Sequence, residues 1–551
     1  MRKLIEKYPV GAVMVFAMLC LLPLMILRDF SPANELRYLS IADEALSGGH
    51  FFAFYNHGVA YADKPPLYFW LVMGGKALFG CHSMPFLALL SLLCAFGIVG
   101  VMDRWALKGA DALTRAGAAV MLLSSALFLG LSVFVRMDML MCLFITLALY
   151  AFWKDRPWLF ALFTFLGLFA KGPVGLLVPL LSVVVWLALR GEGKRILRFA
   201  GWRFLLVVGG LCAVWFGLAY LEGGREYIHN LLVHQTVDRA VNAFHHKKGI
   251  WFYLLVIWGV AAPWCLLTVP SVVSGLKGCR RDDAPVLPDR ALEGFFAVVS
   301  LTTFVMLSLF SSKMAVYLLP MLPFLSYGFV LCERRIGWKG WMKAGLGVAG
   351  GLFVLIGLAF MVAFFAYDAL YLPSEYAFLR TGMLMIYGIM AIWAGVRCFA
   401  TLRTSWKEGV ITMGTVMLAV IFLLSFSLPQ INRRTAYGPL CEDILRVEHM
   451  SPPVLRPSDD TGVSRDFGGS GDGAIYTVGL YRPDNIDVYI GRTAVVIDPA
   501  RLAEMLPQIP VGALIVLDKK KDVLAYGRYS KLLLASGRAP YDSYPLYQIW
   551  K

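Results

Sequence analysis

The chain has 551 residues, of which 59% are hydrophobic and only 16% charged, and its mean hydropathy is +0.68. Soluble proteins carry about a quarter charged residues, so this composition excludes an ordinary soluble protein and predicts a polytopic membrane protein. The net charge of +15 is compatible with a nucleic-acid partner, but the basic residues fall in short loops between apolar segments, which is typical of membrane proteins instead.

Apolar segments close to the roughly 20 residues that cross a bilayer recur up to residue 428 and predict about thirteen transmembrane helices. They are expected near 9–27, 84–102, 116–134, 139–153, 157–170, 173–189, 204–221, 251–272, 293–310, 315–332, 345–366, 379–396 and 409–428. The segment 65–80 is also apolar, but a crossing there would invert the sidedness of every later loop. We therefore predict a re-entrant or interfacial helix at this position.

Basic residues alternate from one inter-helix loop to the next. Loops such as 190–198 and 334–343 are rich in Lys and Arg, whereas 28–83, 222–250 and 367–378 mix positive residues with acidic and aromatic ones. Cytoplasmic loops carry the positive excess. The pattern predicts a cytoplasmic N-terminus and, with an odd number of spans, a C-terminus on the opposite face.

The composition changes after residue 428, where the long apolar segments end. Short β-rich runs and helical patterns alternate in this part of the chain, which predicts a small α/β domain over 429–551. The expected strands are 474–478, 486–490, 494–497, 513–517 and 546–550, and the expected helices are 437–449, 499–507 and 529–536. A glycine-rich phosphate-binding motif is missing here, so we expect an accessory or recognition role, with catalysis in 1–428.

The loop 28–83 is the leading candidate for a functional site because it is long, mixed in charge and rich in aromatic residues. Glu35 and Asp63 offer carboxylates for acid–base work, and Lys64 offers a cation for a phosphate. Two simpler interpretations stay open. Glu35 and Arg37 could form a surface ion pair, and Asp63 could cap a helix that opens at the following prolines.

Three further polar segments are expected on the same side of the membrane. Arg136 and Asp138 lie between two apolar stretches, Lys171 ends another, and Lys313 and Tyr317 open a later one. Each has a simpler interpretation as well. Opposite charges can pair at the level of the lipid headgroups, and a lysine at a helix end often extends to the interface.

The loop 222–250 contains four histidines, among them His245 and His246. Histidine together with a carboxylate can bind zinc, but the spacing matches no established zinc motif. A solvated polar loop is the simpler interpretation.

Taken together, these segments resemble the bacterial aminoarabinose transferases that modify lipid A and, more distantly, the protein O-mannosyltransferases, both of the membrane fold called GT-C. The resemblance rests on short motifs in the same order over residues 1–430. The matching stretches are 32–38 (Pro-Asp-Glu-x-Arg-Tyr in the family), 61–70 (Tyr-x-Glu-Lys-Pro-Pro-Leu), Arg136-Met137-Asp138, Lys171-Gly172-Pro173, and Ser312-Lys313 with 317–320.

The resemblance implies an enzyme of the bacterial inner membrane that moves a sugar from a polyprenyl-phosphate donor to an acceptor at the periplasmic face. It also implies roles for particular residues. Lys64, Arg136, Lys171, Tyr61, Lys313 and Tyr317 would bind the donor phosphate or sugar, Asp138 would line the same cavity, and Arg37 and Tyr38 would lie on the acceptor side. No cofactor is required, but Asp63 with His245 or His246 would offer a zinc site.

One departure from the family bears on catalysis. Asn34 stands where the family has its catalytic Asp, and a neutral amide cannot accept a proton as a carboxylate does. Glu35 is our favoured replacement. Asp138 is an alternative, as are an acceptor that needs little activation and a protein that has lost transfer activity.

The sequence is therefore compatible with three functions. The first is a glycosyltransferase acting on lipid A or another envelope glycan or protein. The second is a transporter or flippase for a polar lipid, which is disfavoured because the polar residues gather in loops rather than at mid-membrane. The third is a glycan-binding protein without chemistry.

Overall fold

The structure is a computed structural model that describes residues 6–32, 34–232, 248–277, 288–366, 383–450, 475–480, 482–505, 508–509, 514–517, 533–534 and 546–548. The chain forms two compact units, and each is described by itself. The membrane unit comprises Met1–Ile26, His50–Phe54 and Ala60–Phe426. The C-terminal unit comprises Leu27–Gly49, Tyr55–Val59 and Ser427–Lys551.

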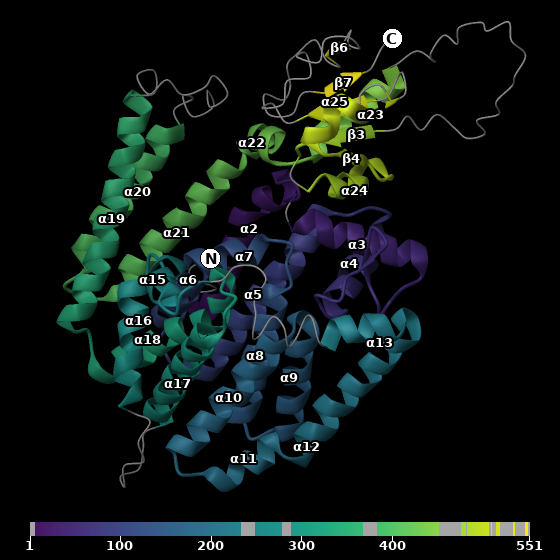
Figure 1. The fold of residues 1–551 in the computed structure, drawn as a ribbon. Helices are drawn as coiled ribbons and strands as arrows, with labels where there is room; N and C mark the ends of the chain where they lie inside the picture. Colours follow the sequence, from purple (N-terminus) through teal and green to yellow (C-terminus); the bar gives the residue numbers. More distant parts are fainter. Residues whose placement is uncertain are drawn as a thin grey trace, which may run out of the picture. The chain divides into compact units, whose positions relative to one another are not determined.

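The membrane unit is helical (Figure 1). Its helices are α2 (Pro9–Leu27), α4 (Leu67–Phe79), α5 (Met84–Ala106), α6 (Ala112–Leu123), α7 (Ala126–Val133), α8 (Asp138–Trp153), α9 (Pro157–Lys171), α10 (Pro173–Leu189), α11 (Gly193–Ala200), α12 (Trp202–Phe204), η1 (Leu205–Gly209), α13 (Gly210–His229), α15 (Phe252–Val260), α16 (Cys265–Leu276), α17 (Pro288–Leu309), η3 (Ala315–Met321), α18 (Leu322–Ile336), α19 (Gly340–Phe365), α20 (Met383–Thr401) and α21 (Trp406–Ser425).

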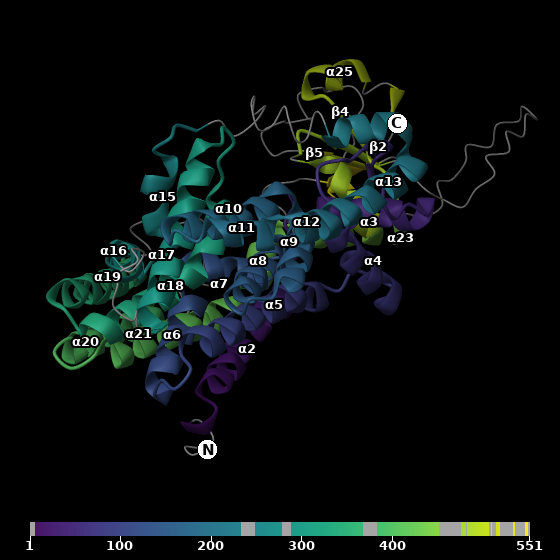
Figure 2. The ribbon, with the colours of Figure 1, turned by 90° about the horizontal axis from the view of Figure 1, so that it is seen from below.

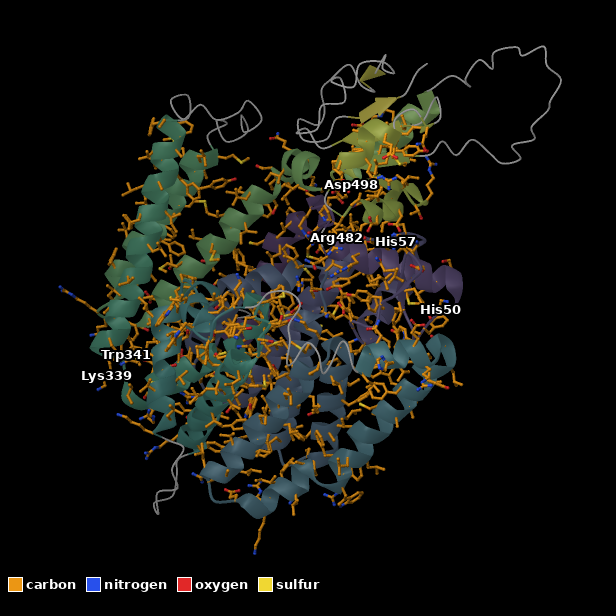
Figure 3. The ribbon with its side chains drawn as sticks, in the orientation of Figure 1. His50, His57, Lys339, Trp341, Arg482 and Asp498 are labelled. Carbon is orange, nitrogen blue, oxygen red and sulfur yellow. The ribbon has the colours of Figure 1, made fainter. Side chains whose placement is uncertain are left out.

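Every predicted span overlaps an observed helix, so the prediction of a polytopic helical membrane protein is confirmed. Eight described helical segments are long and apolar enough to cross a bilayer, and the bent pair α6–α7 would make a ninth. Helices α8, α9 and α10 are apolar but have only 16, 15 and 17 residues. Lys339, at the N-cap of α19, and Trp341, in its first turn, are both exposed (Figure 3).

Two predicted spans are wrong as single helices. The span 116–134 divides into α6 and α7, which bend by 72° at Ser124 and Ser125. Both hydroxyls donate to carbonyls of the preceding helical turn, and Ser124 Oγ also accepts from Trp264 Nε1 at 3.0 Å. Paired serines are a known cause of helix kinks. The span 251–272 divides into α15 and α16 around Pro263, because proline cannot continue the hydrogen-bond ladder.

Helices α8, α9 and α10 pack side by side and carry the polar cluster described below (Figure 1; Figure 2). The close approach of α9 and α10 depends on two glycines, since a Cβ on Gly175 would overlap the backbone of Gly167. The predicted helix at 65–80 is present as α4, which has 13 residues.

The C-terminal unit combines helices with a small mixed sheet. The helices are α3 (Glu35–Gly48), α22 (Leu428–Thr435), α23 (Gly438–Met450), α24 (Asp487–Ile490) and α25 (Leu502–Met505), with short turns η5 (Pro483–Ile486) and η6 (Pro499–Arg501). The strands are β3 (Ile475–Val478), β4 (Val495–Ile497), β5 (Leu514–Leu517), β6 (Leu533–Leu534) and β7 (Leu546–Gln548). Strand β1 (Tyr55–Asn56) belongs to a separate hairpin with β2 (Val59–Ala60).

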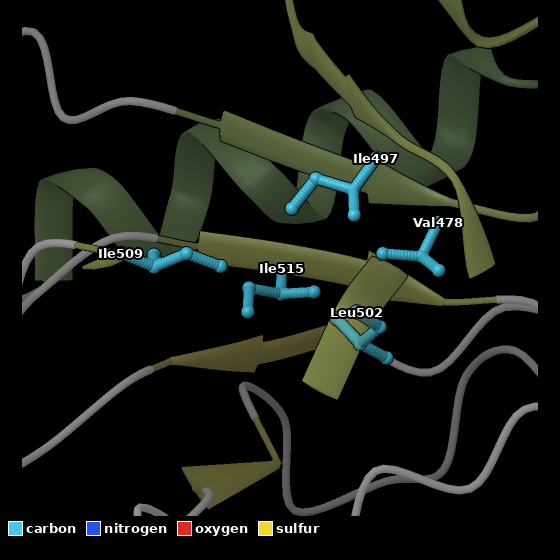
Figure 4. Close-up of a cluster of buried hydrophobic side chains, with 5 residues drawn as sticks. All are labelled: Val478, Ile497, Leu502, Ile509 and Ile515. Carbon is cyan, nitrogen blue, oxygen red and sulfur yellow. The ribbon is translucent and has the colours of Figure 1, made fainter. Parts of the chain in front are cut away.

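The sheet has the order β4-β3-β5-β7-β6, with β3 parallel to β4 and β5 and the β5–β7 and β7–β6 pairs antiparallel. Its small core contains Val478, Ile497, Leu502, Ile509 and Ile515 (Figure 4). The predicted α/β character of this part is therefore confirmed.

Two elements of this unit differ from the prediction. The expected strand 486–490 is the short helix α24, which follows η5 and ends at Gly491, whose φ of 71° lets its N–H bond to the carbonyl of Asp487. The expected helix 529–536 contains strand β6, which pairs with β7. In both cases contacts with neighbouring elements outweigh local propensity.

Candidate functional site

A buried cluster of opposite charges lies where α8, α9 and η3 meet in the membrane unit. Asp138 opens α8, and its side chain is only 1% exposed. One carboxylate oxygen accepts from Arg136 Nε at 3.0 Å, and the other accepts from Lys171 Nζ. The cations are 15% and 8% exposed. Two cations thus share one carboxylate, and the three side chains carry a net charge of +1.

Local sequence explains how these groups converge. Asp138 occupies the first turn of α8, where the helix dipole favours a negative charge. Lys171 is the last residue of α9, where the dipole favours a positive charge. Gly172 then adopts φ 117°, which favours glycine, and Pro173 starts α10. The Lys-Gly-Pro motif is therefore a sharp turn that places a lysine beside the start of α8.

Tyr317 lies in η3 and completes this group, with Lys171 Nζ 4.7 Å from the centre of its ring. A buried ammonium over an aromatic face gains a cation–π attraction. Lys313, four residues earlier, is 4% exposed and donates to the backbone carbonyls of Phe310 and of Lys248, the latter at 3.2 Å. Tyr253 bonds both the N–H and the carbonyl of Met314, which fixes the segment between Lys313 and Tyr317.

The second half of the predicted loop also belongs to the membrane unit. Tyr61, Asp63 and Lys64 are partly buried, and Lys64 Nζ donates to the carbonyl of Asp63 at 3.2 Å. Helix α4 has Pro66 at its N-cap position and no side-chain cap there, so the interpretation of Asp63 as a cap is wrong.

The first half of the loop belongs to the C-terminal unit and contains a second buried ion pair. Arg28 donates to both carboxylate oxygens of Glu35, at 2.7 and 2.8 Å, and the Ser31 N–H donates a third bond at 2.7 Å. Glu35 is fully buried. The suggested surface position of Glu35 is therefore wrong, because its carboxylate is buried and bonded by Arg28.

Asn34 sits at the N-cap of α3 without a side-chain cap bond, and its carbonyl accepts from the N–H of Tyr38. Tyr38 is 3% exposed, and the Arg37 guanidinium lies 5.9 Å from its ring centre. Sequence reasoning missed Arg28 as the partner of Glu35. The only available signal was that Arg28 is the first charged residue after an apolar span.

A metal site is not formed by the part of the chain that the structure describes, where no three His, Cys, Asp or Glu side chains are grouped to hold an ion. The predicted ligands His245 and His246 lie outside the described residues. The role of Asp63 in a metal site therefore stays a prediction.

No family model matches the chain. Comparisons with individual proteins and with solved structures point to the same group of transferases. An undecaprenyl phosphate-alpha-4-amino-4-deoxy-L-arabinose arabinosyl transferase from Shewanella sediminis is 28% identical over 436 residues, which cover 75% of each chain. A protein of the same name from Pectobacterium atrosepticum is 26% identical over 445 residues, covering 76% of this chain and 75% of that one.

The solved structures extend this similarity to the fold. ArnT from Cupriavidus metallidurans bound to undecaprenyl phosphate matches 98% of both chains with a TM-score of 0.71 at 17% identity. Its apo structure matches with the same TM-score. The chain is thus a multi-pass membrane protein with the GT-C fold of ArnT, related in sequence to the undecaprenyl phosphate-aminoarabinose arabinosyl transferases.

Proposed function

We propose that this chain is an integral-membrane glycosyltransferase that moves a sugar from a polyprenyl-phosphate donor to lipid A or another envelope acceptor. The relatives are named for an undecaprenyl-phosphate-linked aminoarabinose, and they align over three quarters of the chain. The observation that carries the proposal for the site is the buried Arg136–Asp138–Lys171 cluster.

The chemistry explains why such a cluster suits this reaction. Cleavage of the sugar–phosphate bond leaves a lipid phosphate with additional negative charge. Fixed cations in a site of low dielectric constant stabilise that charge more than water does. We assign this role to Lys171 and Arg136, and we assign Asp138 the positioning of both cations.

Further donor contacts come from residues on neighbouring elements. The Lys171 ammonium lies over the Tyr317 ring, and we assign this ring to contact the sugar or phosphate of the donor. We assign Lys64, Tyr61 and Lys313 to the donor side as well. Arg37 and Tyr38 we assign to the acceptor side.

The transfer reaction also needs a group that accepts the proton of the acceptor hydroxyl. Glu35 and Asp138 are the candidates, with Asn34 adjacent to the first. Each carboxylate is already hydrogen-bonded to at least one cation, Glu35 to Arg28 and Asp138 to Arg136 and Lys171. To act as the base, Glu35 must leave Arg28. An amine or acidic acceptor hydroxyl would need no strong base.

The sidedness follows from the loop charges. We place the N-terminus in the cytoplasm, the C-terminal domain of residues 429–551 in the periplasm and the membrane domain of residues 1–428 in the bacterial inner membrane. Catalysis by fixed cations needs no cofactor. A zinc ion held by Asp63 with His245 or His246 would have a structural or substrate-organising role.

A direct assay tests the proposal. Purified protein is incubated in detergent or vesicles with a polyprenyl-phosphate-linked aminoarabinose and lipid A, and both released polyprenyl phosphate and modified lipid A are measured by mass spectrometry. Release of polyprenyl phosphate with transfer of sugar supports the enzyme. Movement of the intact donor across vesicles without cleavage supports a flippase, and binding without either supports a glycan-binding protein.

A further inference from the structure

The end of α13 holds the segment that leads to Lys64. The Glu222 carboxylate accepts hydrogen bonds from three successive backbone N–H groups, those of Phe51 at 3.0 Å, Phe52 at 2.6 Å and Ala53 at 2.9 Å. Three consecutive N–H groups aimed at one point form a concave anion-binding site. Here a side chain of the same unit fills that site.

Tyr227, also in α13, fixes the next part of the segment. Its hydroxyl accepts from the N–H of Phe54 at 3.1 Å and contacts the carbonyl of Tyr61 at 3.3 Å. These two positions also bond directly, from the Tyr61 N–H to the Phe54 carbonyl at 2.8 Å. Tyr227 is 3% exposed, so these bonds are shielded from water.

Two glycines of α13 allow this helix to approach the segment that contains Ala53. A Cβ on Gly223 would lie 2.7 Å from Cβ of Tyr227 and 2.8 Å from Cβ of Ala53, so only glycine fits there. The adjacent Gly224 has φ 69° and bends the helix, which brings Tyr227 back toward the segment.

The segment is joined in turn to the helices of the charged cluster. Trp70 of α4 donates from Nε1 to the carbonyl of Phe51 at 2.7 Å, and its ring packs edge-on against Phe169 of α9 at 5.3 Å. Phe169 lies two residues before Lys171 and also contacts Trp215 of α13 at 5.3 Å. Phe54 packs on Phe69 of α4 with ring centres 4.7 Å apart.

We propose that Glu222 and Tyr227 are positioning residues for the transfer reaction. They hold residues 51–54 and Tyr61 against α13, and so set the positions of Lys64 and of helices α4 and α9. The inference rests on the proposed function, in which Lys64 and Lys171 bind the donor phosphate. Neither Glu222 nor Tyr227 touches the reacting atoms in this account.

The test combines hydrogen exchange with kinetics in the full-length protein. Glu222→Gln keeps the size of the side chain but brings an NH2 group to the backbone N–H groups, and Tyr227→Phe removes only the hydroxyl. The matched controls are Glu226→Gln and Tyr220→Phe, on exposed positions of the same helix.

Amide exchange of residues 51–54 should rise at least about tenfold in Glu222→Gln, and that of Phe54 should rise in Tyr227→Phe. The kcat per folded protein, measured well below the Tm, should fall about 10- to 100-fold, because small misplacement of a binding group is costly to catalysis. Both controls should match the wild type. Glu222→Asp, which retains the carboxylate, should recover part of kcat.

Faster exchange with wild-type kcat in both variants would overturn the inference, as would unchanged exchange. A fall in kcat that only follows the fraction of folded protein would also overturn it, because that is the result of a purely structural role. If the wild-type chain transfers no sugar, the proposed function fails. The exchange rates then still decide whether Glu222 and Tyr227 hold the segment.

Discussion

Glu35 in the C-terminal unit and Asp138 in the membrane unit are both buried against cations, but the two groups differ in their charge balance. In the C-terminal unit Glu35 receives one guanidinium, from Arg28, in a bidentate pair. In the membrane unit Asp138 receives both Arg136 and Lys171. The charges of Arg28 and Glu35 sum to zero, whereas those of Arg136, Asp138 and Lys171 sum to +1.

We propose that this difference in charge distinguishes which of the two groups binds the donor phosphate. Arg28 bonds both oxygens of Glu35, Ser31 adds a third hydrogen bond, and the pair balances its own charge. Excess positive charge in a buried site is costly unless an anion compensates for it. We therefore propose the Arg136–Asp138–Lys171 cluster, rather than the Arg28–Glu35 pair, as the binding site for the donor phosphate.

The largest effect should come from neutralising each carboxylate. Asp138→Asn and Glu35→Gln should each cost about 3–5 kcal/mol in the free energy of unfolding, because each leaves buried cations without their partner. Undecaprenyl phosphate should then raise the Tm of Asp138→Asn more than that of the wild type, since an anion bound to the folded state replaces the lost charge. Thermal unfolding with and without the lipid measures both.

Glu35→Gln should respond to the lipid as the wild type does. Equal shifts of Tm in all three proteins would contradict the distinction between the two groups.

The next largest effect concerns catalysis. Lys171→Met should lower the rate of sugar transfer about 10²- to 10³-fold, the usual result of removing one group that stabilises developing negative charge. Its stability should fall less than that of Asp138→Asn, because Asp138 keeps Arg136 as a partner. Transfer assays at matched amounts of folded protein measure the effect.

Lys154→Met is the matched control for this lysine. Lys154 also ends a helix and lies 5.6 Å from a tyrosine ring, that of Tyr150, but it is exposed and lies at the other end of α8. A similar loss of activity in both variants would contradict the assignment of Lys171 to the donor phosphate.

A smaller effect is expected at Tyr317. Tyr317→Leu should raise the donor KM about tenfold, because it removes a cation–π contact worth about 1–2 kcal/mol at a desolvated lysine. Tyr317→Phe keeps the ring and should stay near the wild type. Steady-state kinetics with varied donor concentration test this, and equal KM values for the Leu and Phe variants would contradict the role of the ring.

The smallest effect is a pH dependence within the C-terminal unit. His57 lies in the hairpin (Figure 3), and its Nε2 is 3.0 Å from Asp487 Oδ2. This hydrogen bond raises the pKa of His57 against the opposing effect of burial, with Asp487, Asp484 and Glu44 adding electrostatic attraction. A raised pKa in the folded state means that the stabilisation is complete below the unfolded value of about 6.5 and is lost as the pH rises through the folded value.

Between about pH 5.5 and about pH 8.5 the wild type should therefore lose about 1 kcal/mol of stability relative to His57→Gln. Thermal unfolding of both proteins across this range measures the difference. Parallel pH curves for the two proteins would show that His57 contributes no such linkage.

Much of the fold could be predicted because apolar length and loop charge are local properties of the chain. The ends of α2, α8 and α10 fall within a residue of the prediction for this reason. The breaks at Ser124 and Pro263 were missed because both residues lie within long apolar runs that resemble single spans.

In the candidate site, too, single residues could be predicted from the sequence but their contacts could not. Lys171 and Asp138 were recognised because charges stand out between apolar spans. Their pairing, across 33 residues, depends on how α8 and α9 pack. Glu222 was overlooked because nothing in its local sequence distinguishes it, and its three hydrogen bonds reach about 170 residues back along the chain.

The most direct test of the central claim is the affinity of the membrane unit's cluster for a lipid phosphate. Equilibrium binding of undecaprenyl phosphate to the purified full-length chain is compared between the wild type, Lys171→Met and Lys154→Met, with undecaprenol as the lipid that lacks phosphate. The wild type and Lys154→Met should prefer the phosphate form, and Lys171→Met should bind it at least about tenfold more weakly. Equal affinity of all three proteins for undecaprenyl phosphate, or no preference over undecaprenol, would contradict the account.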